Sequence, residues 1–199
     1  MGFLSVGYPG AVGCFSGINE AGLAVGSHEV FGSPGRGFDP RGVPFASIIR
    51  RVLETCATTR EAEALVRTTP RTTSVSLALC DVNGPAALEV TPGAVVRRAP
   101  HCGACVCTNH FTGPGLASNR PADVFATVTR HRTLEHLASA GTRIGMTSAW
   151  SALHSVHQGE LTLQSMVFEP MARAVSVALG VGPATALTPT RLSLPELIA

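Results

Sequence analysis

The most informative segment of the chain is Gly13-Cys14-Phe15-Ser16-Gly17-Ile18-Asn19-Glu20-Ala21-Gly22-Leu23-Ala24-Val25. Two short apolar runs flank the turn 19–22, which ends in glycine, a residue that adopts turn conformations other residues avoid. Short apolar runs on either side of such a turn predict an antiparallel hairpin. A further extended segment is predicted at Phe3–Tyr8, so we expect an antiparallel sheet to begin here.

Two helices are predicted next. Apolar residues recur at positions i, i+3, i+4, i+7, i+8 and i+11 from Phe45 to Cys56, which is the period of one helical face. Thr58 followed by Glu61 is a capping box and predicts the start of a second, short helix. Residues 32–43 are rich in glycine and proline and are predicted to form a loop.

From residue 74 the apolar period changes to two, and Asn83-Gly84 predicts a tight hairpin. We expect further strands at residues 86–90, 94–98 and 105–111. A helix is predicted from Pro121, another over residues 148–157, and a last hairpin over 163–179. The order β-β, α-α, β-β-β-β, α-α, β-β predicts an α+β domain over residues 1–180 with antiparallel sheets covered by helices. Residues 181–199 are predicted to form a Pro/Thr-rich tail.

Composition excludes several classes of partner. The chain has 199 residues, 15 arginines, no lysine and a net charge of +2, with no basic run that could neutralise a row of phosphates. We therefore expect no nucleic-acid partner. No uncharged apolar run of 18 residues suits a membrane span, and no basic segment opens a secretion signal, so we expect no membrane association and a cytoplasmic location.

The segment from His101 to His110 is dense in cysteine. A site built from Cys102, Cys105, Cys107 and His110 would make the chain a small metal-binding domain. The spacing is cramped, however, and the usual second ligand pair a dozen or more residues away is missing. We keep this as an alternative and otherwise expect free thiols, no metal and no cofactor.

Several motifs resemble one family. The segment 13–25 resembles the G-x-x-x-G-x-N-E-x-G-L-A-V hairpin of the penicillin acyltransferase-like (peptidase C45) group, which are N-terminal-nucleophile hydrolases related to the choloylglycine hydrolases. The resemblance continues in the same order through Asp81-x-x-Gly84 with Glu89, the segment 107–111 and Thr129-x-x-Arg132. It implies a four-layer αββα sandwich of antiparallel sheets, here incomplete.

The resemblance also implies a reaction: hydrolysis or acyl transfer on a small acyl-amide or acyl-thioester substrate through an acyl-cysteine intermediate. Asn109 matches the family's oxyanion-hole asparagine. Arg132 resembles the arginine that supports the active site, with Arg130 as its nearby rival. His28 stands where the family often has asparagine, and we expect it, with His110, to bind substrate.

The expected nucleophile is the main departure from the family. In the family it lies well upstream of the hairpin, so this chain is expected to be truncated at its N-terminus, with the nucleophile encoded upstream or supplied by a complementing chain. Cys14 is the alternative nucleophile because Gly13-Cys14 resembles an autoprocessing junction. A catalytically inactive binding or partner domain of the same fold is a further alternative, and an unpaired sheet edge would favour homo-oligomers.

Overall fold

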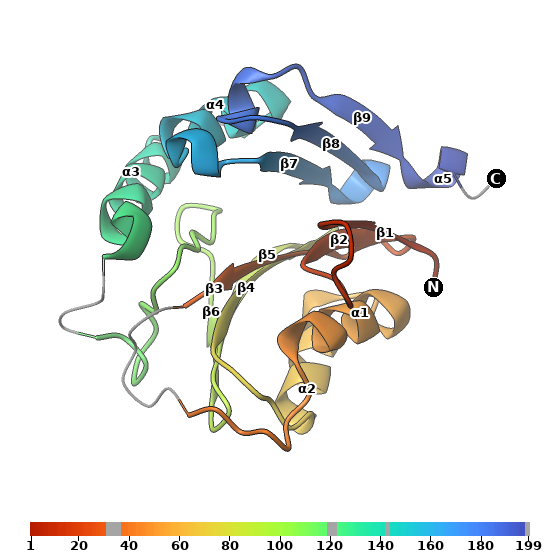
Figure 1. Ribbon diagram of the computed structural model, residues 1–199, viewed down its shortest axis with the longest axis vertical. Helices are drawn as coiled ribbons and strands as arrows, with labels where there is room; N and C mark the ends of the chain where they lie inside the picture. Colours follow the sequence, from red (N-terminus) through yellow and green to blue (C-terminus); the bar gives the residue numbers. More distant parts are fainter. Residues whose placement is uncertain (31–36, 119–122, 142–143, 198–199) are drawn as a thin grey trace.

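The computed structural model describes residues 1–30, 37–118, 123–141 and 144–197, and its elements form four layers (Figure 1). Helices α1 (Phe45–Thr55) and α2 (Thr59–Thr68) form one outer layer. A six-stranded sheet and a three-stranded sheet form the two middle layers. Helices α3 (Thr127–Ser139) and α4 (Met146–Ser155) form the second outer layer. This is the αββα sandwich that the family resemblance implies.

The first sheet is an antiparallel meander in which every strand pairs with its neighbour in sequence. Its strands are β1 (Phe3–Val6), β2 (Ser16–Asn19), β3 (Ala24–Glu29), β4 (Val75–Asp81), β5 (Gly84–Val90) and β6 (Val95–Arg98). The second sheet has the order β7-β8-β9 and is also antiparallel. Its strands are β7 (Gln164–Glu169), β8 (Ala174–Leu179) and β9 (Thr190–Ser193).

Most predicted elements are confirmed. The hairpin of segment 13–25 is β2–β3, the turn at Asn83-Gly84 joins β4 to β5, and the last hairpin is β7–β8. The Thr58 hydroxyl accepts a hydrogen bond from the Glu61 backbone N–H at 3.2 Å, as expected of the residue that caps α2. Asp81 accepts from the backbone N–H groups of Asn83 and Thr59, so it shapes the β4–β5 turn and holds the start of α2.

Asn19 joins the predicted hairpin to the helical layer. Its side-chain Nδ2 donates to the carbonyl oxygens of Leu53 and Cys56, at 3.0 and 2.7 Å, where α1 ends. Its Oδ1 accepts from the backbone N–H groups of Ala21 and Leu23 within the turn. Asn19 is fully buried, so these bonds satisfy polar groups that water does not reach.

Gly22 completes this turn. Its φ of +84° is unfavourable for residues with a side chain, and a Cβ atom there would lie 2.6 Å from the Pro170 carbonyl oxygen. Pro170 begins the connection from β7 to β8 (Pro170–Ala172). The β2–β3 turn therefore lies directly against the second sheet's connection, which only glycine permits.

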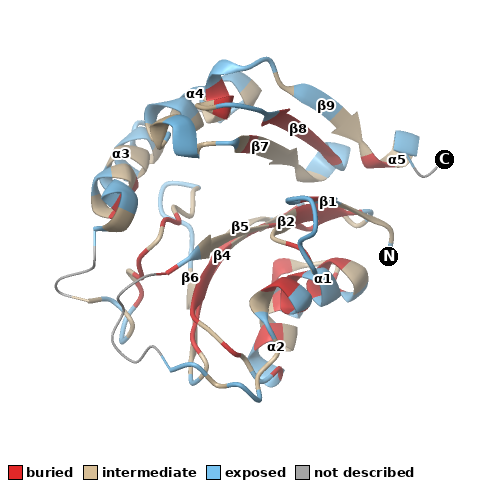
Figure 2. Ribbon diagram, viewed as in Figure 1, coloured by how far each residue is buried: buried red, intermediate tan, exposed pale blue. Residues whose placement is uncertain are grey.

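Two apolar clusters hold the layers together (Figure 2). The larger lies between the helices and the face of the first sheet that we call the outer face, where alternate residues of β3, β4 and β5 meet α1 and α2: Leu23, Val25, Val75, Leu77, Leu79, Leu88, Ile48, Ile49, Val52 and Leu53. The smaller joins the two sheets through Val6 of β1 and Val175 and Val177 of β8. The face of the first sheet turned toward the second sheet is called the inner face below.

Three predictions of local structure are corrected. Residues 105–111 form no strand, because their backbone groups bind side chains of neighbouring elements instead of a strand. The helix predicted from Pro121 has its expected start outside the described residues, and α3 begins only at Thr127, after Phe125 and Ala126 take φ of 57° and 52°.

The third correction concerns residues 181–199, which were predicted to form a tail. They contain β9 and the short helix α5 (Leu194–Leu197), whose first residue is buried. The run of threonine, proline and leucine shows no strand period of its own. These residues form a strand because they pair with the edge of the apolar strand β8 that β7 leaves open.

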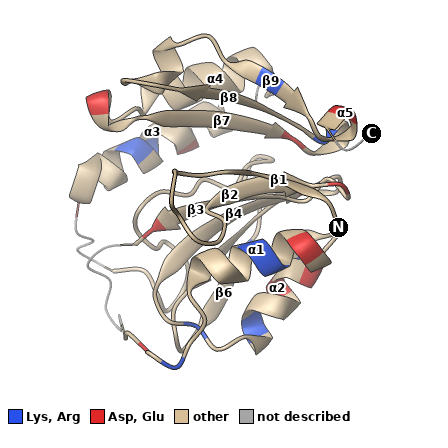
Figure 3. Ribbon diagram, turned by 45° about the vertical axis from the view of Figure 1, so that its right-hand side comes forward, with Lys and Arg blue, Asp and Glu red and all other residues tan. Residues whose placement is uncertain are grey.

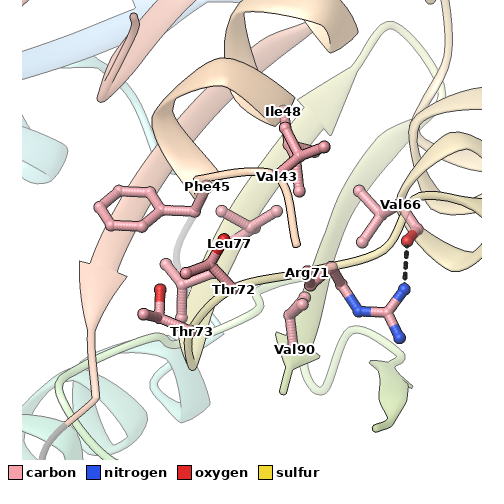
Figure 4. Close-up of a pocket in the computed structure, with 10 residues that line it drawn as sticks. Val43, Phe45, Ile48, Val66, Arg71, Thr72, Thr73, Leu77 and Val90 are labelled. Carbon is pink, nitrogen blue, oxygen red and sulfur yellow. Dashed lines mark hydrogen bonds between the residues drawn. The ribbon is translucent and has the colours of Figure 1, made fainter. Parts of the chain in front are cut away.

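A small cavity lies at one end of the larger cluster (Figure 4). Its volume is about 10 Å³, room for a single water molecule. It is lined mainly by apolar side chains, with Arg71 at its margin donating to the Val66 carbonyl oxygen at 2.7 Å. Arg71 also donates to the carbonyl oxygens of Thr69 and Thr91, so it closes the end of α2. The cavity is too small for an acyl-amide substrate.

Charged residues of both signs are interspersed along α1 and α2 (Figure 3). Arg50 forms an ion pair with Glu54, and Arg67 forms one with Glu63, each one helical turn apart.

Within the described residues, no helix is both long and apolar enough to cross a membrane.

We predict that Asn19→Ala lowers the free energy of unfolding by about 3 kcal/mol, because it leaves buried carbonyl and N–H groups without partners. Chemical denaturation followed by circular dichroism measures this change. Asn83→Ala is the matched control, since Asn83 is exposed in the β4–β5 turn and its loss should change stability by less than about 0.5 kcal/mol. Equal effects of the two substitutions would contradict the role given to Asn19.

Candidate functional site

The inner face of the first sheet is lined by polar and small side chains. Strand side chains alternate between faces, and the apolar residues of β4 face the helices, so Ser76 and Ala78 face inward. In register across the strands, His28 lies opposite Ser76, and Ser76 lies opposite Glu89. A row of polar residues therefore crosses the inner face at the end of β3.

Asn109 lies beside this row. Its backbone N–H donates to Thr127 Oγ1 at 2.8 Å, and its side-chain Nδ2 donates to the Glu29 carbonyl oxygen at 2.8 Å. Its Oδ1 accepts from Arg130 Nη2 at 2.7 Å. An amide nitrogen carries two hydrogens. The Asn109 side-chain amide is thus held through both its oxygen and its nitrogen, while its second N–H has no bond to the described residues.

Arg130, rather than Arg132, makes this contact. The Arg130 side chain is half-buried and also donates to the Phe125 carbonyl oxygen at 2.9 Å. Arg132 lies two residues further along α3 and is exposed. The helical period explains the difference: Thr127 and Arg130 are three residues apart and share the face of α3 that turns toward Asn109.

His28 is neutral in this environment. Its Nδ1 atom is buried and has no hydrogen-bond partner among the described residues. Burial, together with the positive charge of Arg130, lowers the pKa of His28 from 6.5 to about 4. The ring therefore carries no charge at neutral pH. It adds a hydrogen-bonding group beside the Asn109–Arg130 pair.

His110, the other predicted substrate-binding residue, lies inside the protein. Its Nδ1 lies 3.2 Å from Thr108 Oγ1 and 3.0 Å from Thr127 Oγ1, and its ring packs edge-on against His131. Burial and the neighbouring His131 lower the pKa of His110. Its contacts tie the Asn109 segment to α3.

Cys14 is not brought together with Asn109. It is buried in the cluster on the outer face, and its backbone N–H donates to the Ala46 carbonyl oxygen of α1. His28 and Asn109 lie at the inner face. The six-stranded sheet therefore stands between the alternative nucleophile and the predicted oxyanion donor.

Four of the other thiols are less readily ionised than a free cysteine. Burial raises the pKa of Cys56, Cys80, Cys105 and Cys107. Cys107 is two residues from Asn109, and Arg98 Nη2 lies 3.5 Å from its Sγ. Burial outweighs the favourable effect of this arginine, so the Cys107 thiol stays protonated at neutral pH.

The metal-binding alternative is not supported by the geometry. Cys102 is exposed in a turn, where its φ is 49°, whereas Cys107 is buried below Arg98. Among the described residues, no three histidine, cysteine, aspartate or glutamate side chains come together in a way that could hold a metal ion. The cysteines of the segment from His101 to His110 therefore do not converge on one point, because Cys102 is exposed and Cys107 is buried.

A second cavity, an open cleft of about 370 Å³, lies elsewhere. It is lined by Glu20, Arg173, Leu194 and Pro195. Glu20 belongs to the turn before β3, whereas the Glu29 carbonyl that holds Asn109 is at the other end of that strand. This cleft is therefore separate from the candidate site.

The αββα sandwich thus carries a fixed asparagine, an arginine and a neutral histidine at the end of β3. Residues 1–182 match the family described as acyl-coenzyme A:6-aminopenicillanic acid acyl-transferase, and the chain belongs to that family. No curated protein sequence matches the chain significantly.

Solved structures agree with the fold. The chain is similar to a variant of the conjugated bile acid hydrolase of Clostridium perfringens, with a TM-score of 0.72 and 12% identity, over 96% of this chain and 76% of that one. It is also similar to penicillin V acylase from Agrobacterium tumefaciens, with a TM-score of 0.64 and 19% identity, over 90% of this chain and 65% of that one. The chain thus spans about two thirds to three quarters of these proteins.

We predict that His28 makes stability depend on pH. The folded protein resists protonation of His28 until about pH 4, whereas the unfolded chain binds that proton near pH 6.5. Stability is therefore complete above pH 6.5 and falls as the pH drops from 6.5 toward 4. Urea unfolding at pH 7 and pH 4.5 should show a smaller loss for His28→Asn than for the unsubstituted protein. The same loss in both would show that His28 is not held neutral.

Proposed function

We propose that this chain forms the main part of an amide hydrolase or acyltransferase that works through an acyl-cysteine on small acyl-amide or acyl-thioester substrates. The family match and the similar solved structures support the class of reaction. The observation that carries the proposal is the Asn109 side chain, which Arg130 and the Glu29 carbonyl hold in place while its second N–H has no bond to the residues that the structure describes. A fixed donor of this kind suits a charge that develops during reaction.

The proposed step follows from these groups. A cysteine thiolate attacks the carbonyl carbon of the amide, and the carbonyl oxygen becomes negatively charged. The second N–H of the Asn109 amide donates to this oxygen, and Arg130 orients Asn109 through its Oδ1. The C–N bond then breaks, and the amine leaves with the proton that the thiol gave up when it became a thiolate, so that a thioester remains. Water or a second amine attacks the thioester and restores the thiol.

We propose that the nucleophilic cysteine is supplied from outside residues 1–199, by a preceding segment or by a complementing chain. The raised pKa of four thiols and the position of Cys14 on the outer face support this assignment. Cys14 remains the alternative within the chain. A domain that binds the acyl ligand without turning it over is the second alternative, because burial raises the pKa of four of the thiols.

One experiment separates these proposals. Residues 1–199 alone, and the same residues with the polypeptide encoded in frame upstream, are incubated with penicillin V and N-acyl amino acids, and the acylated peptide is located by mass spectrometry. An adduct on a cysteine outside residues 1–199 supports the proposal. An adduct on Cys14 with loss of residues 1–13 supports the alternative nucleophile. Binding without any adduct or amine release identifies a binding domain.

We predict that Asn109→Ala lowers kcat about 100-fold in the form that turns over substrate, because the oxyanion loses its donor. Amine release under single-turnover conditions measures the effect. Asn83→Ala serves again as the control, since Asn83 is exposed in a turn remote from β3's end. An unchanged rate in a folded Asn109→Ala variant would refute the oxyanion role.

We predict a difference between two neighbouring arginines. Arg130→Gln should lower kcat/KM by roughly tenfold or more, because Asn109 loses the group that orients it. Arg132→Gln removes an exposed side chain on the same helix and should change kcat/KM by less than about twofold. The reverse result would return the supporting role to Arg132, as the family motif suggests.

A further inference from the structure

A buried ion pair lies on the inner face beside the Asn109 segment. Glu89 of β5 is fully buried, and its Oε1 lies 2.8 Å from Arg98 Nε on the neighbouring strand β6. The preceding residue of β6, Arg97, points to the opposite face and pairs with Glu63 of α2 at 3.1 Å. Two adjacent arginines of one strand thus form ion pairs on different faces of the sheet.

Each partner of the inner pair holds one end of the same irregular segment. Arg98 Nη2 donates to the Val106 carbonyl oxygen at 2.6 Å. Glu89 accepts from the backbone N–H groups of Thr112 and Gly113, both at 2.8 Å. The segment between these anchors is neither helix nor strand, so no ladder of backbone hydrogen bonds sets its shape.

Asn109 lies midway between the anchors, three residues after Val106 and three before Thr112. We propose that Glu89 and Arg98 act as a clamp that positions Asn109, so that its amide presents its second N–H in one orientation. The catalytic meaning of this positioning depends on the proposed function, whereas the positioning itself does not. Glu89 and Arg98 are positioning residues, because they act through the segment that carries Asn109.

The contact with Gly113 shows how closely the carboxylate is fitted to the backbone. A Cβ atom at Gly113 would lie 2.8 Å from Glu89 Oε2 and 3.0 Å from Val96 Cγ1. A side chain there would displace the carboxylate or the segment. Gly113→Ala therefore loosens the Glu89 end of the clamp without removing a charge.

Stability alone is a weak reason for such a pair. Desolvation of two charges offsets their attraction, and buried ion pairs can often be replaced by neutral side chains of similar size without loss of stability. Removing only one partner is harmful because it leaves a buried charge. The informative variant is therefore the double substitution Glu89→Gln with Arg98→Met, and its matched control is Glu63→Gln with Arg97→Met.

The experiment is nitrogen-15 NMR on the 199-residue chain. The side-chain amide signals of Asn109 are assigned by their disappearance in Asn109→Ala. The inner double variant is expected to shift these signals toward the values of free asparagine and to speed hydrogen exchange at Thr112 and Gly113 at least tenfold. Amide exchange of Leu77 and Leu88 in the larger apolar cluster should stay unchanged. The control double variant should leave the Asn109 signals in place.

Two outcomes overturn the proposal. One is a folded inner double variant in which Thr112 and Gly113 exchange faster but the Asn109 side-chain signals do not move, which would make the pair a structural anchor only. The other is an equal shift in the control variant. If the inner double variant does not fold, Gly113→Ala takes its place. Asn109 side-chain signals that do not move in a folded Gly113→Ala variant would then overturn the proposal.

Activity gives an independent readout in the form that turns over substrate. The inner double variant and Gly113→Ala should lower kcat at least tenfold with KM changed less than threefold, since the oxyanion donor is misplaced while the substrate still binds. If no form of the protein cleaves an amide, the proposed function fails while the NMR result still decides the clamp. Unchanged kcat with displaced Asn109 signals would confirm the clamp and contradict the oxyanion role of Asn109.

Discussion

The buried Asn19 side chain is the interaction on which the arrangement of layers depends. It satisfies two carbonyl oxygens at the end of α1 and two N–H groups in the β2–β3 turn at once. The helical layer is thereby fixed to one end of β3, while Gly22 brings the same turn against the second sheet. Because β3 is rigidly placed, the groups at its other end, His28 and the Glu29 carbonyl, have defined positions.

The candidate site is built at that other end from parts that are distant in sequence. β3 supplies His28 and a carbonyl oxygen, the irregular segment supplies Asn109, and α3 supplies Arg130. Burial, together with the positive charge of Arg130, lowers the pKa of His28 and keeps its ring neutral. The segment that carries Asn109 has no regular backbone hydrogen bonding, so side chains must fix its position. Glu89 and Arg98 bind its backbone at Thr112 and Val106.

Local patterns predicted most of the fold because their physical causes are local. Apolar spacing located α1, β4 and the hairpins, and the capping box located the start of α2. The pattern misled where tertiary contacts replaced local ones. Cys105 and Cys107 alternate as in a strand, but the backbone there binds Arg98 and Thr127. Residues 190–193 carry no strand period, and they form β9 because β8 has an edge to cover.

The sequence by itself determined the antiparallel hairpins, since periodicity is a property of the chain, and the resemblance of its motifs to a known family indicated the class of the protein and made Asn109 and His28 candidates. Only the tertiary structure decided which arginine serves Asn109, because helical phase depends on where α3 begins, and its expected start at Pro121 lies outside the described residues. It also placed Cys14 on the far face of the sheet and His110 in the interior. Burial and distance are set by packing between elements, and no residue pattern encodes them locally.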